Sequence, residues 1–189
     1  MDTINKTRTF IAVRLDNSLS ANLHSIACSI SKGKSNIRVI PAENIHLTLK
    51  FIGDVESKDI EIIKALLEDI AKKNKAFKSS LEKTIDAFPG MKKAKVILFK
   101  VFKGSREIVD IFKDIEKGLS SIGVKKETRG FIPHITIARS RKPSDLVFLK
   151  GKSLFDKYPE IDVSNITLFK STLKNTGAEY SIIECFDLK

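Results

Sequence analysis

The sequence is poor in cysteine. Its 189 residues contain only Cys28 and Cys185, which form no CxxC arrangement. Disulfide-dependent folds and structural zinc sites both need several cysteines at characteristic spacings. The sequence therefore predicts neither a disulfide framework nor a zinc motif, and both thiols are expected to be reduced and at least partly buried.

Long apolar runs are also missing. No stretch approaches the ~18 to 20 apolar residues that span a bilayer, and residues 1–15 lack the apolar core and cleavage site of a signal peptide. These absences favour a cytoplasmic protein with no membrane partner. The hydrophobic content of 42% is still ample for a packed core.

Acidic residues are outnumbered by basic ones. The chain has 34 Lys+Arg against 23 Asp+Glu, which gives a formal net charge of +11. This balance favours an anionic partner such as nucleic acid. The basic residues are dispersed and form no arm, however, so charge alone leaves nucleic-acid affinity and mere solubility equally open.

Histidine is scarce, and its placement is the most informative feature of the chain. Two of the three histidines lie in the same four-residue pattern, His46-Leu47-Thr48-Leu49 and His134-Ile135-Thr136-Ile137. A single copy describes any half-buried strand. Two copies among three histidines are poorly explained by coincidence.

The pattern predicts a strand in each copy. Alternate residues of a strand point to the same face, so the histidine and the threonine stand together while the apolar residues point into the core. We expect strands over 7–15, 37–40, 45–52, 76–87, 95–103, 131–138, 161–173 and 178–187, the last two joined around 175–177, and helices over 17–31, from 57 to about 70, over 108–119 and over 144–157.

Each motif strand thus has similar strands and helices as its neighbours in the sequence. The order of elements predicts an α+β fold, with residues 1–189 forming one domain of two similar lobes. Each lobe would offer one motif strand to a shared central cleft.

A cleft with one His and one Thr from each side suits phosphoryl displacement. A base must stand beside the entering oxygen and an acid beside the departing one, and histidine can hold either role near neutrality. Threonine hydroxyls can donate to the non-bridging oxygens and stabilise the charge that builds there. This scheme requires no metal, and the sequence has no HExxH, His-x-His or carboxylate cluster near either motif.

At this point the chain resembles the two-histidine (2H) phosphoesterase superfamily, and within it the RNA 2′,3′-cyclic phosphodiesterases, also called 2′-5′ RNA ligases. The resemblance spans nearly the whole chain. Besides both motifs, it rests on these phrases in the family's order: Arg8-Thr9-Phe10-Ile11-Ala12-Val13, Glu43 to Gly53, Phe88-Pro89, Phe131 to Arg139, Ser171-Thr172-Leu173 and Gly177-Ala178-Glu179-Tyr180.

The resemblance implies a bilobal fold of two antiparallel sheets with outer helices and an approximate two-fold symmetry. It implies cofactor-free and metal-free hydrolysis of RNA 2′,3′-cyclic phosphate ends to 2′-phosphates by a monomer, with tRNA fragments among the candidate substrates. His46 would be the proton donor to the 3′ oxygen and His134 the proton acceptor from water. Thr48 and Thr136 would hold the phosphate.

Five further residues are candidates for substrate binding. Arg139, three positions after Thr136, is expected to reach the phosphate or the neighbouring nucleotide. Phe131 could stack on a base or belong to the core. Arg8 and Phe10 share a strand face and could line the cleft, and Lys50 continues the face of His46 and Thr48 and could contact phosphate.

Other functions stay open at this stage. Ligation of RNA ends or cleavage of 2′-5′ linkages would use related chemistry in the same cleft. A non-catalytic RNA-binding module would also suit a net charge of +11, although both intact His-Thr pairs count against a loss of catalysis.

Overall fold

The computed structural model describes residues 6–174 and 177–189. Its strands are β1 (Lys6–Arg14), β2 (Ile37–Val39), β3 (His46–Glu56), β4 (Phe77–Ser80), β5 (Asp86–Phe88), β6 (Ala94–Lys100), β7 (His134–Ser144), β8 (Glu160–Val163), β9 (Asn165–Lys174) and β10 (Gly177–Asp187). The α-helices are α1 (Asn17–Ser31), α2 (Ser57–Lys73) and α3 (Ser105–Ser121), and the 3₁₀ turns are Ala42–Asn44, Met91–Lys93 and Val147–Leu149.

The strands form two antiparallel sheets. The large sheet has the order β10-β9-β1-β3-β7-β6-β5, with β2 added beside β7, and the small sheet pairs β4 with β8. Strands β3 and β7 meet in the middle of the large sheet at a single residue pair, Leu47 opposite Ile135. The large sheet therefore consists of two halves, one on each side of this joint.

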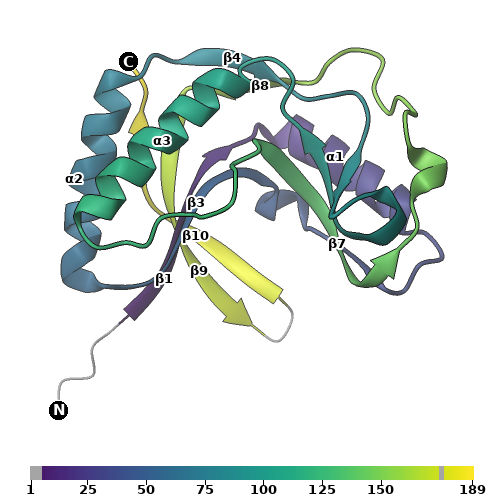
Figure 1. Cartoon of the computed structure of the whole chain (residues 1–189), viewed down its shortest axis with the longest axis horizontal. Coiled ribbons are helices and arrows are strands. Elements are labelled where there is room, and N and C mark those ends of the chain that lie inside the picture. Colours follow the sequence, from purple (N-terminus) through teal and green to yellow (C-terminus); the bar gives the residue numbers. More distant parts are fainter. Residues whose placement is uncertain (1–5, 175–176) are drawn as a thin grey trace.

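The helices lie outside the large sheet (Figure 1). Helices α2 and α3 run side by side and contact each other, whereas α1 lies apart from them and contacts β2 and β7. The contact between α2 and α3 is close because Gly118 has no side chain, and a Cβ at this position would come within 2.5 Å of the Leu66 side chain. Each helix buries one apolar face, as the helical spacing of its isoleucines and leucines predicts.

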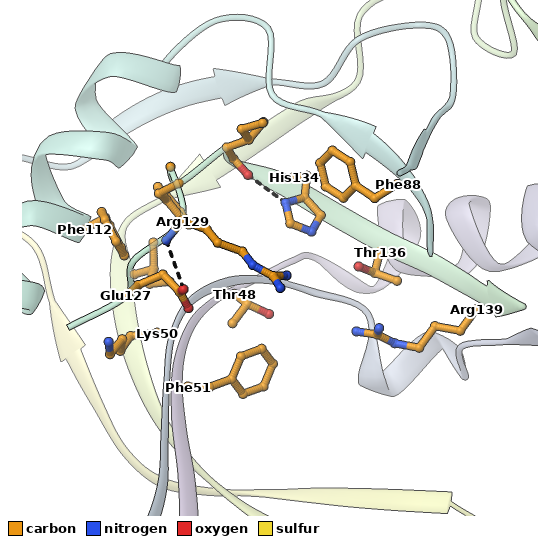
Figure 2. Close-up of a pocket in the computed structure, with 14 residues that line it drawn as sticks. Thr48, Lys50, Phe51, Phe88, Phe112, Glu127, Arg129, His134, Thr136 and Arg139 are labelled. Atoms are coloured by element: carbon orange, nitrogen blue, oxygen red, sulfur yellow. Dashed lines mark hydrogen bonds between the residues drawn. The ribbon is translucent and has the colours of Figure 1, made fainter. Parts of the chain in front are cut away.

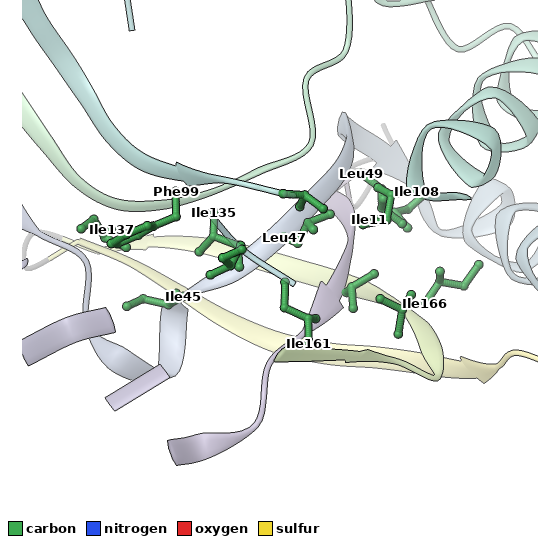
Figure 3. Close-up of a cluster of buried hydrophobic side chains, with 14 of the residues drawn as sticks. Ile11, Ile45, Leu47, Leu49, Phe99, Ile108, Ile135, Ile137, Ile161 and Ile166 are labelled. Carbon is green, nitrogen blue, oxygen red and sulfur yellow. The ribbon is translucent and has the colours of Figure 1, made fainter. Parts of the chain in front are cut away.

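The core runs without a break through both halves. The apolar residues of the two motifs, such as Leu47 and Ile135, are fully buried at its centre, and Phe99 of β6 and Ile11 of β1 extend it to either side (Figure 3). Both motif strands pack on the same core. The polar residues on the opposite face of these strands are therefore fixed relative to one another.

The α+β fold with antiparallel sheets and outer helices confirms the sequence prediction. The helix expected over 144–157 is wrong, since this segment contains only the Val147–Leu149 turn. The strand expected over 76–87 is two strands, β4 and β5, in different sheets. Both cysteines are exposed rather than buried, and of the turn expected around 175–177, positions 175 and 176 lie outside the described residues.

Within the described ranges, none of the helices is both long and apolar enough to cross a membrane.

Candidate active site

Both motif strands begin at their histidine. His46 is the first residue of β3 and His134 is the first residue of β7. In each strand the apolar residues of the motif are buried, whereas the histidine and threonine are half-buried. This alternation confirms the face assignment made from the sequence, because the polar residues of each motif share one face of the sheet.

A local two-fold relates the two motifs. Leu47 and Ile135, the residues that pair at the joint, are each the second residue of their motif, and the strands run antiparallel. The flanking strands repeat this relation, since Arg14 of β1 lies opposite His46 and Lys100 of β6 lies opposite His134. The symmetry expected from the sequence is thus present at the site itself.

The two imidazoles are held in the same way. The Nδ1 of His46 lies 2.8 Å from the carbonyl oxygen of Asn44, and the Nδ1 of His134 lies 2.7 Å from that of Ile132. A carbonyl only accepts, so Nδ1 carries the hydrogen and donates it in both residues. The Nε2 atom of each neutral ring is then left without a proton and free to accept one.

Burial lowers the pKa of both histidines. It is the main reason that the pKa of His46 falls to about 4; the bond to Asn44 opposes this change, and the positive charge of Arg139 adds to it. Burial also lowers the pKa of His134, and the charges of Arg139 and Lys100 lower it further. Both imidazoles are therefore neutral near pH 7 in the ligand-free protein.

Aromatic rings surround each histidine. The ring of His46 lies 4.9 Å from that of Phe10 and 5.4 Å from that of Tyr180, while Phe88 meets His134 edge-to-face at 5.3 Å. These contacts restrict the rings and account for much of their burial. They also exclude water from one side of each imidazole.

A pocket of about 230 Å³ opens on the motif face (Figure 2). Thr48, His134, Thr136 and Arg139 all line it, so the structure brings together four of the predicted site residues. His46 lines a neighbouring hollow of about 400 Å³, together with Arg14 and Tyr180. Because His46 and Thr48 are alternate residues of β3, the two hollows adjoin along this strand.

Three of the five secondary candidates, Arg139, Phe131 and Lys50, line the pocket. Arg139 is exposed at the pocket, and its charge acts on both histidines. Phe131 lines the pocket too, but one face of its ring is stacked on Phe112, with centroids 4.1 Å apart and planes 11° apart. Phe131 is thus packed against the core, as one of the two alternatives has it, and its stacking on a base stays a prediction.

Lys50 lines the pocket with Thr48, but a bulge buries its side chain, and its contact with a phosphate stays a prediction. Thr48 lies opposite Ala12 but Lys50 lies opposite Ile11, so Leu49 is an extra residue in β3. The extra residue reverses the alternation. Lys50 turns inward, where its ammonium pairs with Glu116, and Phe51 turns outward to line the pocket with 61% of its surface exposed.

Phe10 and Arg8 also depart from the prediction. Phe10 is only 1% exposed, because His46, Phe51, Phe169 and Tyr180 cover its ring. Phe10 packs against the ring of His46 and does not line a cleft. Arg8 is exposed, opposite Asp54 on β3, and is not part of the pocket wall around Thr48.

Arg129 is a pocket residue that sequence reasoning missed. It belongs to the segment 122–133 that joins α3 to β7, called here the α3–β7 loop. Figure 2 shows its side chain pointing into the pocket, toward Thr48 and His134. The only signal in the sequence is that Arg129 lies five positions before the second motif histidine. A loop has no regular periodicity, so the sequence does not predict where the Arg129 side chain points.

In the parts of the chain that the structure describes, no three His, Cys, Asp or Glu residues gather as a metal site would require.

Comparison with known proteins gives sequence relatives. Proteins named RNA 2′,3′-cyclic phosphodiesterase include one from Aquifex aeolicus, which is 32% identical over 155 residues that make up 79% of this chain and 80% of the relative. Another, from Methanocaldococcus jannaschii, is 33% identical over 153 residues, 78% of this chain and 83% of the relative.

Solved structures share the fold. Protein TT0787 of Thermus thermophilus superposes with a TM-score of 0.81 at 24% identity, over 96% of this chain and 97% of that one. The E. coli protein LigT in complex with 3′-AMP gives a TM-score of 0.74 at 19% identity, over 98% and 99%. The model of the 2′-5′ RNA ligase superfamily matches residues 20–175. This chain, with its two His-Thr strands joined at Leu47 and Ile135, belongs to that superfamily.

Proposed function

We propose that this protein hydrolyses the 2′,3′-cyclic phosphate ends of RNA to 2′-phosphates. One observation carries the proposal: two His-Thr pairs related by a local two-fold, each with its histidine Nδ1 engaged and its Nε2 free. The name shared by the sequence relatives supports the choice of reaction. The site draws on both halves of the sheet, so residues 1–189 would act as one catalytic domain.

In the proposed reaction the cyclic phosphate lies between the two motifs. The oxygen of a water molecule attacks phosphorus while the Nε2 of His134 accepts its proton. The bond from phosphorus to the 3′ oxygen breaks, and the Nε2 of His46 donates a proton to that oxygen. One water is consumed, and proton exchange with solvent restores both histidines.

The negative charge of the substrate allows His46 to act as the proton donor. His46 is neutral in the free protein because its pKa is about 4, and a proton donor must be protonated. The anionic phosphate favours the imidazolium and raises the pKa of a histidine beside it. In this proposal His46 therefore takes up its proton as substrate binds.

The remaining pocket residues hold the phosphate and the nucleotide. The hydroxyls of Thr48 and Thr136 donate to the non-bridging oxygens. Arg139 and Arg129 supply the positive charge that these oxygens need. The exposed ring of Phe51 offers a surface on which a base can stack.

The same proposal includes three finer points. Both proton transfers come from imidazoles, so catalysis should need no metal. Both motifs come from one chain, so a monomer should suffice. The net charge of +11 would draw RNA to the site, with tRNA fragments among the substrates and the cytoplasm as the place of action.

The test is an assay of the purified protein with a short RNA that ends in a 2′,3′-cyclic phosphate, in excess EDTA. We expect opening of the ring to a 2′-phosphate, identified by phosphorus NMR, and activity lower by at least about 10²-fold in the His46→Ala/His134→Ala variant. A 3′-phosphate product would show that the bond from phosphorus to the 2′ oxygen breaks instead, with the cyclic phosphate held the other way round between the two histidines. Loss of activity that only a divalent ion restores would refute the metal-free scheme.

The assay also separates the competing functions. A second RNA with a 5′-hydroxyl end is added, because a superfamily named for 2′-5′ ligation could join the two ends. A joined product in place of the 2′-phosphate would favour the ligase. Tight binding of the cyclic end with no product would favour a non-catalytic RNA-binding module.

A further inference from the structure

A buried ion pair lies beneath the pocket. Lys50 of β3 and Glu116 of α3 pair there, with side chains only 7% and 11% exposed. Among the residues that the structure describes, each partner makes one further hydrogen bond, and both of these bonds go to the α3–β7 loop. The Lys50 ammonium donates to the carbonyl of Lys125 at 2.9 Å, and the backbone N–H of Glu127 donates to the Glu116 carboxylate at 2.8 Å.

The contacts continue from the ion pair toward the pocket. The carboxylate of Glu127 accepts the backbone N–H of Thr128 at 3.1 Å. It also accepts the backbone N–H of Arg129 at 3.2 Å (Figure 2). A continuous series of hydrogen bonds thus leads from Glu116 to the backbone of Arg129. The side chain of Arg129 then points into the pocket.

Stability of the fold alone gives little reason for this pair. Two charges lose their hydration when they are buried, and an apolar pair of similar volume is often at least as stable. An apolar pair, however, could not bond to the Lys125 carbonyl or to the Glu127 N–H. The charges are therefore suited to holding a loop that has no helix or strand of its own.

We propose that Lys50 and Glu116 are positioning residues that fix the α3–β7 loop so that Arg129 meets the phosphate. The proposal rests on the proposed function for the identity of that phosphate. In this proposal neither residue binds the phosphate, because the ammonium of Lys50, although this residue lines the pocket, is engaged by Glu116. Their effect passes through Arg129, and Phe131 in the same loop is held against Phe112 by the same anchoring.

The first test compares Glu116→Gln, Arg129→Ala and the variant with both changes on the cyclic-phosphate RNA. Glu116→Gln should lower kcat/KM about 3- to 30-fold, mainly by raising KM. The loss from Arg129→Ala should be at least as large, and adding Glu116→Gln to it should cost less than 3-fold more. Glu68→Gln, which breaks the exposed pair with Lys72, is the matched control and should change neither constant. Losses that simply multiply in the double variant would overturn the proposal.

The second test separates positioning from folding. Lys50→Met/Glu116→Met replaces the buried charges by apolar side chains and should melt close to wild type. Its kcat/KM should nevertheless fall as in Glu116→Gln, and the Glu127 amide should exchange its hydrogen faster by NMR. Wild-type kcat/KM in a variant of wild-type stability would mean that the pair serves folding alone.

The two proposals can fail separately. If wild-type protein does not open the cyclic phosphate, the proposed function fails, and exchange at the Glu127 amide still decides the role of the ion pair. Faster exchange in Lys50→Met/Glu116→Met supports the anchoring, and unchanged exchange overturns it.

Discussion

Arg14 lies opposite His46 on the neighbouring strand, and within the described residues no acidic group engages its side chain. Lys100 has the equivalent place beside His134 but is paired with Asp86 at 2.5 Å. The backbone symmetry of the site is therefore not matched by its charge. On the His46 side Arg14 lines the hollow next to that histidine, whereas the cation in the equivalent place beside His134 is already paired.

Because of this asymmetry, we expect the RNA phosphate next to the cyclic end to lie on the His46 side, near Arg14. Arg14→Gln should raise KM for RNA about 10-fold, the effect of losing one charge-assisted hydrogen bond, and should reduce the salt dependence of KM. Lys100→Met should have the smaller effect on KM. Equal effects of the two substitutions, in steady-state assays at several salt concentrations, would count against this asymmetry.

The histidines should dominate turnover. His46→Ala and His134→Ala should each lower kcat about 10²- to 10⁴-fold, the usual contribution of one general acid or base, with combined effects less than additive. A substrate whose leaving group needs no proton should rescue His46→Ala and not His134→Ala. Rescue of His134→Ala instead would show that the roles are exchanged.

Arg139 should govern the protonation of both histidines. Its charge lowers the pKa of His46 and of His134, so Arg139→Gln should raise both values. The acidic limb of the kcat/KM profile, which reports the base of the free enzyme, should then move to higher pH. NMR titration of the imidazole protons measures the shift directly, and an unchanged pair of titrations would place Arg139 away from the site.

The lowered pKa of His46 also predicts a pH-dependent stability. The folded state, with this pKa at about 4, binds fewer protons than the unfolded state, whose histidines titrate near 6.5. The contribution is therefore complete above about pH 6.5 and is lost as pH falls toward 4. Thermal melts of His46→Gln should lose less stability over this window than wild type, and a parallel loss in both proteins would contradict the burial of this imidazole.

Phe51 should contribute to binding of the nucleotide. Phe51→Ala should raise KM about 5- to 150-fold, as loss of one base-stacking contact of about 1–3 kcal/mol implies, with little change in melting temperature because the ring is exposed. Phe148→Ala is the control, since Phe148 is 54% exposed and lines a different hollow. Comparable KM values for the two variants would exclude a stacking role for Phe51.

The sequence predicted those features of the site that depend on regular alternation. Two equally spaced His-Thr patterns were enough to place both motifs on strands with their apolar residues in the core, which the burial of Leu47 and Ile135 confirms. The burial of Lys50 and the exposure of Phe51 could not be predicted from this alternation, because the extra residue at Leu49 reverses the faces of the residues that follow it. A bulge depends on the register with the partner strand, which a single strand's sequence does not contain.

Positions outside regular elements were harder to predict. The segment 144–157 has enough apolar residues for a helix, but they pack onto the core as single residues, such as Leu146, Leu154 and Phe155, along a loop. Arg129 was missed for a similar reason. Its backbone N–H donates to Glu127, whose own N–H donates to Glu116, and these two residues lie on a loop and a helix before the motif strand.

The single residue pair between β3 and β7 has a mechanical consequence. Any rocking of one half of the molecule against the other must turn about Leu47 and Ile135, since the strands separate on either side of them. Displacement in such a motion grows with distance from the pivot, and each motif histidine adjoins a pivot residue. The two imidazoles, like the two motif threonines, would therefore be displaced least by such a motion, and the spacing of the imidazoles would be preserved.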